Sequence, residues 1–585
     1  MTREAGAAVS NDRGGAWRAL SGGLLYGLLM GLALPPFGFW ALVLAAPAPL
    51  AWAALRVGGA PWRRGLWAAA GTLPFWGFTL RWVWAVTDLG LAPFCVLQAS
   101  WAGLFVWLLA RADEAGRRLP ALARLGPALI APVLWTGVEY VRGEILFDGY
   151  AWALLGHPLI EAPALARAGA YLGVYFVSFL ACVPAGAMGE RFARTGSRTR
   201  GLTALALAGA AWALPALLPA HQPAAASSLR VAVVQTNVPQ DNKIAWEIEQ
   251  ELRDFDHFVA LTRRAAGATP RPDLIIWPET MLPGPTLEPE SLGILRSQGV
   301  YETAGEPPNA QKVPLAAFAD GLLDLQKILG VPMLVGEETW TGLSVERTPS
   351  GHVSVEYAHR FNSVYLVRDG RTVGPRYDKV RLTPFGEYMP YIDAWPWLKR
   401  QVLAVAARGM AFNLEAGRAL TVFEVGGVGE SLARLVTPIC FEATESTLCR
   451  RMIYDGPTRR ADVLVNLTND GWFGSFDLTR EQHLQIARWR CVELGVPLVR
   501  AANTGISAIV DTAGRVVGRG VESGSGYRRE GLLVGEVEFD PHAPPTLFAR
   551  VGNLFGQVAC GLAALLALAS FWRGSRRKFE EARTG

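Results

Sequence analysis

The sequence predicts an α-helical membrane domain of about eight spans joined to an α/β domain outside the membrane. Long apolar segments recur through the first 219 residues and once more near the C-terminus. Between these regions, short apolar runs alternate with amphipathic stretches. A chain of 585 residues with 51% hydrophobic residues and a mean hydropathy of +0.21 is too long and too apolar for a single soluble domain.

Apolar segments of about 18 to 22 residues are long enough to cross a hydrocarbon core as helices. Such segments lie near residues 17–34, 37–55, 65–87, 91–110, 125–142, 164–188, 201–219 and 550–572. After the first segment, Leu34, Pro35 and Pro36 lead directly into a second apolar segment, and no cleavage site of small residues follows. We therefore expect the first segment to be a retained helix.

Basic residues in the short connections predict the orientation, because cytoplasmic loops are enriched in Lys and Arg. Every second connection is basic, whereas the turns at Pro35–Pro36 and near residues 88–90 carry almost no positive charge. The basic groups are Arg56, Arg63 and Arg64; Arg111, Arg117, Arg118 and Arg124; Arg191, Arg194, Arg198 and Arg200; and Arg573, Arg576, Arg577 and Lys578. Both termini are thus expected in the cytoplasm, and the long segment between spans seven and eight on the opposite side.

The expected domain boundaries follow from these assignments. They are a cytoplasmic N-terminal tail at 1–16, membrane helices one to seven within 17–219, a linker at 220–228, an extracytoplasmic α/β domain at 229–543, helix eight at 544–572 and a basic cytoplasmic tail at 573–585. A transporter is disfavoured, because it needs ionisable groups within its spans. We expect Glu139 and Arg142, at the end of span five, to be an interfacial pair or snorkelling side chains.

The charge and the cysteines exclude other classes. The net charge of +5 does not cluster on one predicted face, so a nucleic-acid partner is not expected. The six cysteines include no CxxC pair, which disfavours a zinc site or a disulfide framework. Cys95, Cys182 and Cys560 lie in apolar segments, and Cys449 and Cys491 are interpreted as inert small hydrophobes. Only Cys440 remains as a candidate for chemistry.

Alternation of strand and helix patterns predicts the α/β domain. Strands are expected at 229–236, 273–279, 332–338, 363–369, 434–440, 462–470, 496–511 and 532–539. A helix is expected at 318–329, and Thr479 and Gln482 resemble a capping box that opens a helix ending near Gly495. In such domains the functional side chains follow the carboxyl ends of strands.

Three polar side chains stand at such ends or in the loops after them: Glu279, Lys379 and Cys440. A free thiol is mostly protonated at neutral pH and needs a base or a nearby cation to become a nucleophile. Glu279 can accept the thiol proton, and Lys379 can stabilise the thiolate and a tetrahedral intermediate. Each residue alone also has a structural interpretation: an inert buried cysteine, a capping glutamate or an unremarkable lysine. His483 is expected to be a structural residue on a helix face.

The strings IIWPE (275–279), YDKVRLTPFGE (377–387), CFE (440–442) and NDGWFG (469–474) resemble the nitrilase, or carbon-nitrogen hydrolase, superfamily. The resemblance implies a four-layer α-β-β-α sandwich, with Glu279 as general base, Lys379 as cation and Cys440 as nucleophile. It also implies supporting roles for Glu387 and Glu442. No metal or other cofactor is implied.

The whole chain, from about residue 17 to 575, resembles the bacterial apolipoprotein N-acyltransferases. The further matching strings are APVLWTGVEYVRG (131–143), TNVPQDNKIAW (236–246), the segment 482–511 and ARVGN (549–553). The resemblance implies substrate-binding roles for Arg142, Trp246 and Phe441, although Trp246 could equally be a core residue. Phe441 is a departure, because this family commonly has Tyr there, and Phe lacks the hydroxyl.

The implied reaction is a ping-pong acyl transfer in the bacterial inner membrane, with the catalytic domain on the periplasmic side. Cys440 takes an acyl chain from a phospholipid as a thioester and passes it to the α-amino group of an S-diacylglyceryl cysteine at the N-terminus of an apolipoprotein. The expected partners are these two lipid substrates and the bilayer, with the enzyme a monomer. Two alternatives stay open: a membrane-anchored amidase that uses water as acceptor, and a pseudoenzyme that binds lipoproteins. The apolar segment 391–412 is either an arm that dips into the membrane interface or a packed helix.

Overall fold

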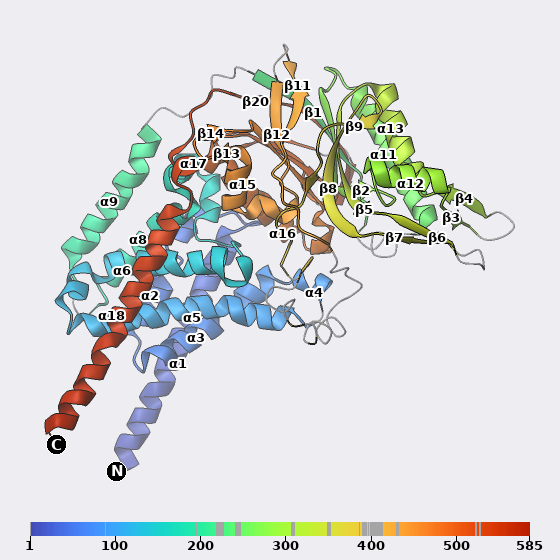
Figure 1. Cartoon of the computed structure of the whole chain (residues 1–585). Helices are drawn as coiled ribbons and strands as arrows, with labels where there is room; N and C mark the ends of the chain where they lie inside the picture. Colours follow the sequence, from blue (N-terminus) through green and yellow to red (C-terminus); the bar gives the residue numbers. More distant parts are fainter. Residues whose placement is uncertain are drawn as a thin grey trace. The chain divides into compact units, whose positions relative to one another are not determined.

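The computed structural model divides the chain into two units, Met1–Ala220 with Thr546–Gly585, and His221–Pro545 (Figure 1). The structure describes the whole chain except residues 1, 88, 194–195, 218–226, 240–246, 306–309, 348–352, 385, 389–394, 396, 398–413, 429–431, 521–522, 526–527 and 585. The side chains of residues 2–13, 216, 523–525, 528 and 572–584 are also outside the description.

The first unit consists of helices. They are α1 (Thr2–Ala33), η1 (Trp40–Leu44), α2 (Ala48–Arg56), α3 (Pro61–Thr79), α4 (Val83–Val86), α5 (Leu91–Gly116), α6 (Pro120–Tyr140), η2 (Val141–Ile145), η3 (Leu146–Asp148), η4 (His157–Glu161), α7 (Pro163–Ala166), α8 (Gly169–Gly189), α9 (Arg198–Leu217), α17 (Leu547–Val551) and α18 (Leu554–Thr584). α1 and α18 include most of the residues expected as terminal tails.

Within the described residues, 4 helical segments are long and apolar enough to cross a membrane. They are Leu91–Gly116, Pro120–Asp148, Gly169–Gly189 and Leu554–Phe571. The segments expected at 37–55 and 65–87 are each divided into two shorter helices, at residues 45–47 and 80–82. The count of about eight spans therefore stays a prediction.

Glycines bring the helices of this unit close together. A Cβ on Gly65 of α3 would lie 2.6 Å from the carbonyl oxygen of Gly103 in α5, and a Cβ on Gly103 would lie 2.7 Å from the carbonyl oxygen of Gly65. Small residues permit such contacts between backbones, and close packing substitutes for the hydrophobic effect where lipid is the solvent.

The second unit contains two large sheets. The first has the order β10-β8-β5-β2-β1-β20-β19, with β9 beside β8. Its strands are β1 (Ser227–Gln235), β2 (Leu274–Leu282), β5 (Met333–Thr341), β8 (His359–Arg368), β9 (Arg371–Thr372), β10 (Tyr377–Asp378), β19 (Ser523–Ser525) and β20 (Arg528–Phe539). β1, β2 and β5 are parallel, whereas β8 and β20 flank them in the antiparallel direction.

The second sheet has the order β11-β12-β15-β16-β17-β18. Its strands are β11 (Phe423–Gly426), β12 (Leu432–Val436), β15 (Val463–Thr468), β16 (Leu498–Ala502), β17 (Ala508–Val510) and β18 (Val516–Arg519). β12, β15 and β16 are parallel, so their carboxyl ends share one edge of this sheet. Three hairpins complete the unit: β3 (Tyr301–Ala304) with β4 (Gln311–Pro314), β6 (Ser344–Arg347) with β7 (Val353–Glu356), and β13 (Tyr454–Asp455) with β14 (Thr458–Arg459).

The two sheets pack face to face, because β2 contacts both β15 and β16. Helices α11 (Ile248–Ala266), α12 (Pro289–Gln298) and α13 (Ala317–Leu329) contact the first sheet (Figure 1). α15 (Ser446–Ile453) and α16 (Asp477–Leu494), which connect the parallel strands of the second sheet, contact each other.

The central strand β2 of the first sheet is buried on both faces. Ile275 and Trp277 of β2 belong to the core cluster formed with α11, α12 and α13, whereas the alternate residues Leu274 and Ile276 are equally buried on the other face. This explains why the sequence shows continuous apolar runs here in place of a polar alternation.

Three details of the predicted elements were wrong. The strand expected at 434–440 ends at Val436, and the strand expected at 496–511 is two antiparallel strands, β16 and β17. The capping box at Thr479 and Gln482 is not formed, because α16 already begins at Asp477 and both residues lie inside it. Gly505, at a φ of 123°, explains why the run 496–511 is divided into two strands, since a glycine within an apolar run permits the chain to reverse its direction.

Gly336 of β5 provides a test of this packing. A Cβ there would lie 2.9 Å from the Cα of Glu279 in β2, so we expect Gly336→Ala to separate the strands and to cost about 1–3 kcal/mol. Thermal unfolding of the detergent-solubilised protein, followed by near-ultraviolet circular dichroism, measures the change. Gly293→Ala in α12 is the matched control, because nothing lies within 4 Å of its added Cβ and alanine favours a helix by about 0.5–1 kcal/mol. Equal melting temperatures for the two variants would contradict the close approach.

Candidate active site

Cys440 lies on a sharp turn at the carboxyl edge of the second sheet. After β12 ends at Val436, Ile439 forms an isolated bridge to Leu467 of β15, and Cys440 then opens the short helix η7 (Cys440–Thr444). The φ of Cys440 is 51°, in the left-handed region that side-chain-bearing residues rarely adopt. The thiol therefore lies at a strained turn between strand and helix, as the sequence predicted, although β12 ends at Val436 and not at Cys440.

Glu279 of β2 and Lys379, directly after β10, form an ion pair with Lys379 Nζ 3.5 Å from Glu279 Oε1. Two uncharged donors fix the same carboxylate: Asn362 Nδ2 donates to Oε1 at 2.8 Å, and the backbone N–H of Asn469 donates to Oε2 at 2.8 Å. Both Glu279 and Lys379 are buried. The structure thus brings together residues from both sheets.

Glu387 holds the other side of the Lys379 ammonium. Lys379 Nζ donates to Glu387 Oε1 at 2.8 Å, and the backbone N–H of Thr383 donates to Glu387 Oε2 at 2.7 Å. The loop after β10 thus folds back on itself around the lysine. One ammonium between two carboxylates leaves this cluster with a net negative charge when both glutamates are ionised.

The charges shift the pKa values of the lysine and the thiol. Burial alone would lower the pKa of Lys379, but Glu387 and Glu279 outweigh it and raise its pKa above the ordinary value. Burial also raises the pKa of Cys440, Glu279 raises it further, and Lys379 acts in the opposite direction. The resting pair is therefore a charged lysine and a protonated thiol. Such a thiol needs a proton acceptor when it attacks, and Glu279 is a carboxylate in its immediate environment.

Glu442, two residues after the thiol, ties the turn to the Lys379 loop. Its carboxylate accepts hydrogen bonds from the backbone N–H groups of Val380 and Arg381 at 2.8 Å and of Ile439 at 2.7 Å, and from the Tyr377 hydroxyl. Burial raises the pKa of Glu442 to about 7, and the donated hydrogen bonds limit the rise. This side chain connects the segment that carries the cation to the segment that carries the thiol.

Comparison with known proteins identifies the family. Residues 26–187 match the model of the apolipoprotein N-acyltransferase N-terminal domain, and residues 230–540 match the carbon-nitrogen hydrolase model. Apolipoprotein N-acyltransferases of Sinorhizobium medicae and Brucella melitensis are 32% and 31% identical to the chain. The first alignment covers 85% of this chain and 86% of the relative, and the second covers 86% and 87%. The chain belongs to the apolipoprotein N-acyltransferase family.

Among solved structures, this family member is similar to a mutant amidase from Nesterenkonia sp. AN1 with an acetamide moiety attached to its active-site cysteine. The sequence identity is 17%, the TM-score is 0.33, and the match covers 53% of this chain and 91% of the amidase.

The residues expected to bind substrate have different positions in the acyltransferase. Phe441 is buried beside Cys440 in η7, whereas Trp246 lies outside the described residues. Most of the expected arm at 391–412 also lies outside them. Two of its tryptophans, Trp395 and Trp397, are described and are each 67% exposed.

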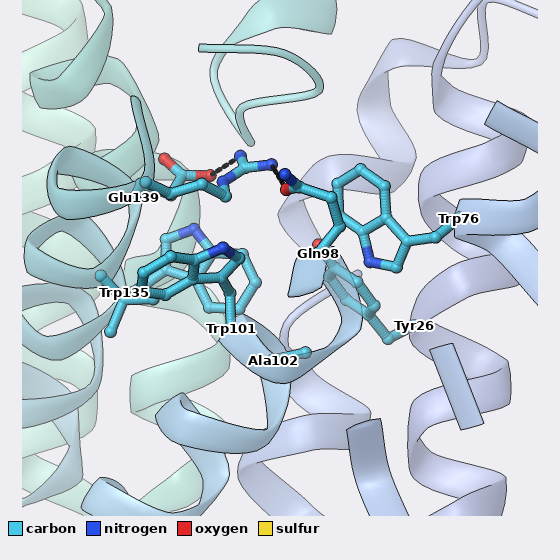
Figure 2. Close-up of a pocket in the computed structure, with 9 residues that line it drawn as sticks. Tyr26, Trp76, Gln98, Trp101, Ala102, Trp135 and Glu139 are labelled. Carbon is cyan, nitrogen blue, oxygen red and sulfur yellow. Dashed lines mark hydrogen bonds and ion pairs between the residues drawn. The ribbon is translucent and has the colours of Figure 1, made fainter. Parts of the chain in front are cut away.

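Arg142 lies in the helical unit, where it lines a small pocket with Glu139, Gln98 and three tryptophans (Figure 2). Its guanidinium is 4.0 Å from Glu139, donates to Gln98 Oε1 at 3.4 Å and lies over the Trp76 ring. Both charged side chains are buried inside this unit, so of the two expected arrangements they form the pair and do not snorkel. The ion pair and the amide contact compensate for the loss of hydration.

Sequence reasoning missed the amides and charges that surround the triad candidates. Asn362 and Asn469 hold Glu279, and Asn466 Nδ2 donates to the carbonyl oxygens of Pro438 at 2.8 Å and Cys440 at 3.3 Å. The available signal was a polar residue inside an apolar strand, as in VLVNLT and LVRAA. A buried polar group needs partners, which makes such residues candidates for a site.

Glu442→Gln tests the connection between the turn and the loop. The amide NH₂ would face N–H donors, so we expect a loss of about 1–3 kcal/mol in stability and a fall in acyl-transfer activity. The melting temperature and the activity of the detergent-solubilised enzyme give both quantities. Glu481→Gln, which alters an exposed ion pair with Arg519, serves as control and should change stability by less than about 1 kcal/mol. A Glu442→Gln enzyme that is as stable and active as this control would show that the connection is dispensable.

Proposed function

We propose that this protein transfers an acyl chain from a membrane phospholipid to the α-amino group of the N-terminal S-diacylglyceryl cysteine of apolipoproteins. The observation that carries the proposal is the half-buried Cys440 beside the buried pair of Glu279 and Lys379, in a chain that belongs to the apolipoprotein N-acyltransferase family. In this proposal Cys440 is the nucleophile, Glu279 the general base and Lys379 the stabilising cation.

In the first half-reaction, Cys440 Sγ attacks the ester carbonyl of the phospholipid while Glu279 accepts the thiol proton. The cluster of one ammonium and two carboxylates loses its net negative charge at that moment, so the oxyanion of the tetrahedral intermediate forms beside a neutral group. The carbon–oxygen ester bond then breaks, and the lysophospholipid leaves as an alcohol with the proton from Glu279. Cys440 keeps the acyl chain as a thioester.

In the second half-reaction, the acceptor amine attacks the thioester carbonyl and gives its proton to Glu279. The carbon–sulfur bond breaks, an amide forms, and the sulfur leaves with the proton that Glu279 returns. Glu387 supports both steps, because its contact at 2.8 Å keeps Lys379 charged throughout. Glu442 supports them by holding the turn and the loop together.

The proposed setting is the bacterial inner membrane, with the α/β domain on the periplasmic side and both termini in the cytoplasm. The alternation of basic and neutral connections supports this orientation. Both substrates are anchored in the outer leaflet, so a site at that surface would meet them by diffusion in the membrane plane. Arg142, Trp246, Phe441 and the segment 391–412 are the proposed substrate contacts.

The acyl-enzyme can be detected directly. We expect the intact protein to gain the mass of one acyl chain after incubation with phospholipid, and this mass to move to the amine of a diacylglyceryl-cysteine peptide in a chase. Cys440→Ala should gain no mass, whereas Cys491→Ala, which removes a buried thiol of the same unit, should still be acylated. An adduct lost to water at the same rate with and without peptide would favour an anchored amidase over an acyltransferase.

Glu279→Gln tests the proposed base. The amide keeps the size of the carboxylate but cannot accept the thiol proton, so we expect thioester formation to slow by about 10²–10⁴-fold. Lys379→Ala should also lose most activity, because the oxyanion loses its cation. The rate of thioester formation, followed by mass spectrometry in a single turnover, measures both. Full activity of either variant would mean that its proposed role is wrong.

A further inference from the structure

A buried polar cluster lies directly behind the thiol turn and has no part in the proton transfers described above. It consists of Asn466 on β15, Asp470 in η8 (Asp470–Phe473), His483 on α16 and Arg500 on β16, hereafter the Arg500 cluster. Each of these side chains is between 0% and 2% exposed. Burying a charge pair costs desolvation energy, so a contribution to stability is weak grounds for its presence.

Arg500 is the centre of the cluster. Its Nη1 donates to Asn466 Oδ1 at 2.5 Å, and its Nη2 lies 2.9 Å from both carboxylate oxygens of Asp470. His483 Nδ1 lies 3.0 Å from Asp470 Oδ1 and 3.0 Å from Arg500 Nη2. Burial would raise the pKa of Asp470, but Arg500 and His483 outweigh it and hold the pKa below the ordinary value. The pair of Asp470 and Arg500 therefore balances its own charge.

The cluster reaches the nucleophile through Asn466. This side chain, whose amide oxygen is held by Arg500, donates from Nδ2 to the carbonyl oxygens of Pro438 and Cys440. The carbonyl groups of the turn that carries the thiol are thus held from β15.

The cluster also reaches the proposed base. Asn469 immediately precedes Asp470, and its backbone N–H donates to Glu279 Oε2 at 2.8 Å. Asp470 fixes this short segment, because its side chain is bound by Arg500 and also accepts from Thr468 Oγ1 at 3.2 Å. One buried group of side chains is therefore connected to both the thiol and the carboxylate that would take its proton.

We propose that the Arg500 cluster positions Cys440 and Glu279 for acyl transfer. A non-glycine residue keeps a left-handed backbone only where its surroundings fix it, and Cys440 has a φ of 51°. Released from Asn466, this turn relaxes toward an ordinary conformation and carries the sulfur away from Glu279. The four members are positioning residues, and the inference rests on the proposed function of Cys440 and Glu279.

The test compares Asn466→Leu with Arg434→Met. Leucine has a similar size to asparagine, leaves every charge in place and removes both hydrogen bonds to the turn. Arg434→Met removes an arginine that binds the buried Asp462 at 2.9 Å, at the opposite end of the parallel strands of the same sheet. It is the matched control for a general loss of buried polar contacts in this sheet.

Two rates are measured on folded, detergent-solubilised enzyme. The first is thioester formation in a single turnover at several phosphatidylethanolamine concentrations, which separates the rate at saturation from the concentration dependence. The second is alkylation of Cys440 by iodoacetamide, mapped by peptide mass spectrometry. We expect Asn466→Leu to lower the rate of thioester formation at saturation by about 10- to 100-fold. Its half-saturating phospholipid concentration should stay within about twofold of the wild-type value, and its alkylation rate should change. Arg434→Met should keep both rates within about twofold.

His483 supplies a second pair of variants that does not depend on the folding of Asn466→Leu. Gln retains an amide that can bond to Asp470, whereas Leu does not, so we expect His483→Gln to keep most of the rate that His483→Leu loses. Equal saturating and alkylation rates for Asn466→Leu and Arg434→Met, or a change confined to the half-saturating concentration, would overturn the proposal. A wild-type enzyme that forms no thioester would refute the proposed function instead, and the alkylation rates would still decide whether the cluster positions the thiol.

Discussion

The buried ammonium of Lys379 is the constraint on which the site depends. The side chain is 1% exposed, and an isolated ammonium at such a position would lose its proton. Glu387 at 2.8 Å and Glu279 at 3.5 Å prevent this, and the loop that carries Glu387 is folded so that the Thr383 N–H fixes the second carboxylate oxygen. β2, β10 and the loop after β10 are thus arranged so that two carboxylates keep this buried lysine charged.

The two-sheet architecture makes this possible. Glu279 and Lys379 come from the first sheet, and Cys440 and Asn469 follow strands of the second. Because β2 contacts β15 and β16 directly, the ends of strands from both sheets meet. A site on one sheet alone would leave one side of the lysine open to water, where its attraction to a developing oxyanion would be weaker.

The sequence predicted candidate residues for the site but not their local geometry. Two apolar runs end in Glu279 and Cys440, and the string PFGE contains Glu387. These patterns involve only neighbouring residues, so they can be recognised without knowledge of the fold. The left-handed turn at Cys440 was not predictable, because the residue is not glycine and its conformation depends on Asn466 and Glu442. Arg500 was equally hidden, since its partners Asn466, Asp470 and His483 are brought together only by sheet pairing and helix packing.

The surroundings of Glu279, Glu387 and Glu442 differ in a way that separates their proposed roles. Glu442 accepts from three backbone N–H groups and a tyrosine hydroxyl, and Glu387 has the short contact with Lys379, so changing the protonation of either would disturb the structure around the lysine or the turn. Glu279 accepts from one amide and one backbone N–H, and its lysine contact is the longer one. Its charge also raises the pKa of the Cys440 thiol, whereas Glu387 and Glu442 are not among the main causes of that shift. Glu279 thus interacts electrostatically with the thiol, and it can gain a proton while the shorter ion pair of Lys379 with Glu387 stays intact. These properties suit it to take the thiol proton and to return it in the second half-reaction.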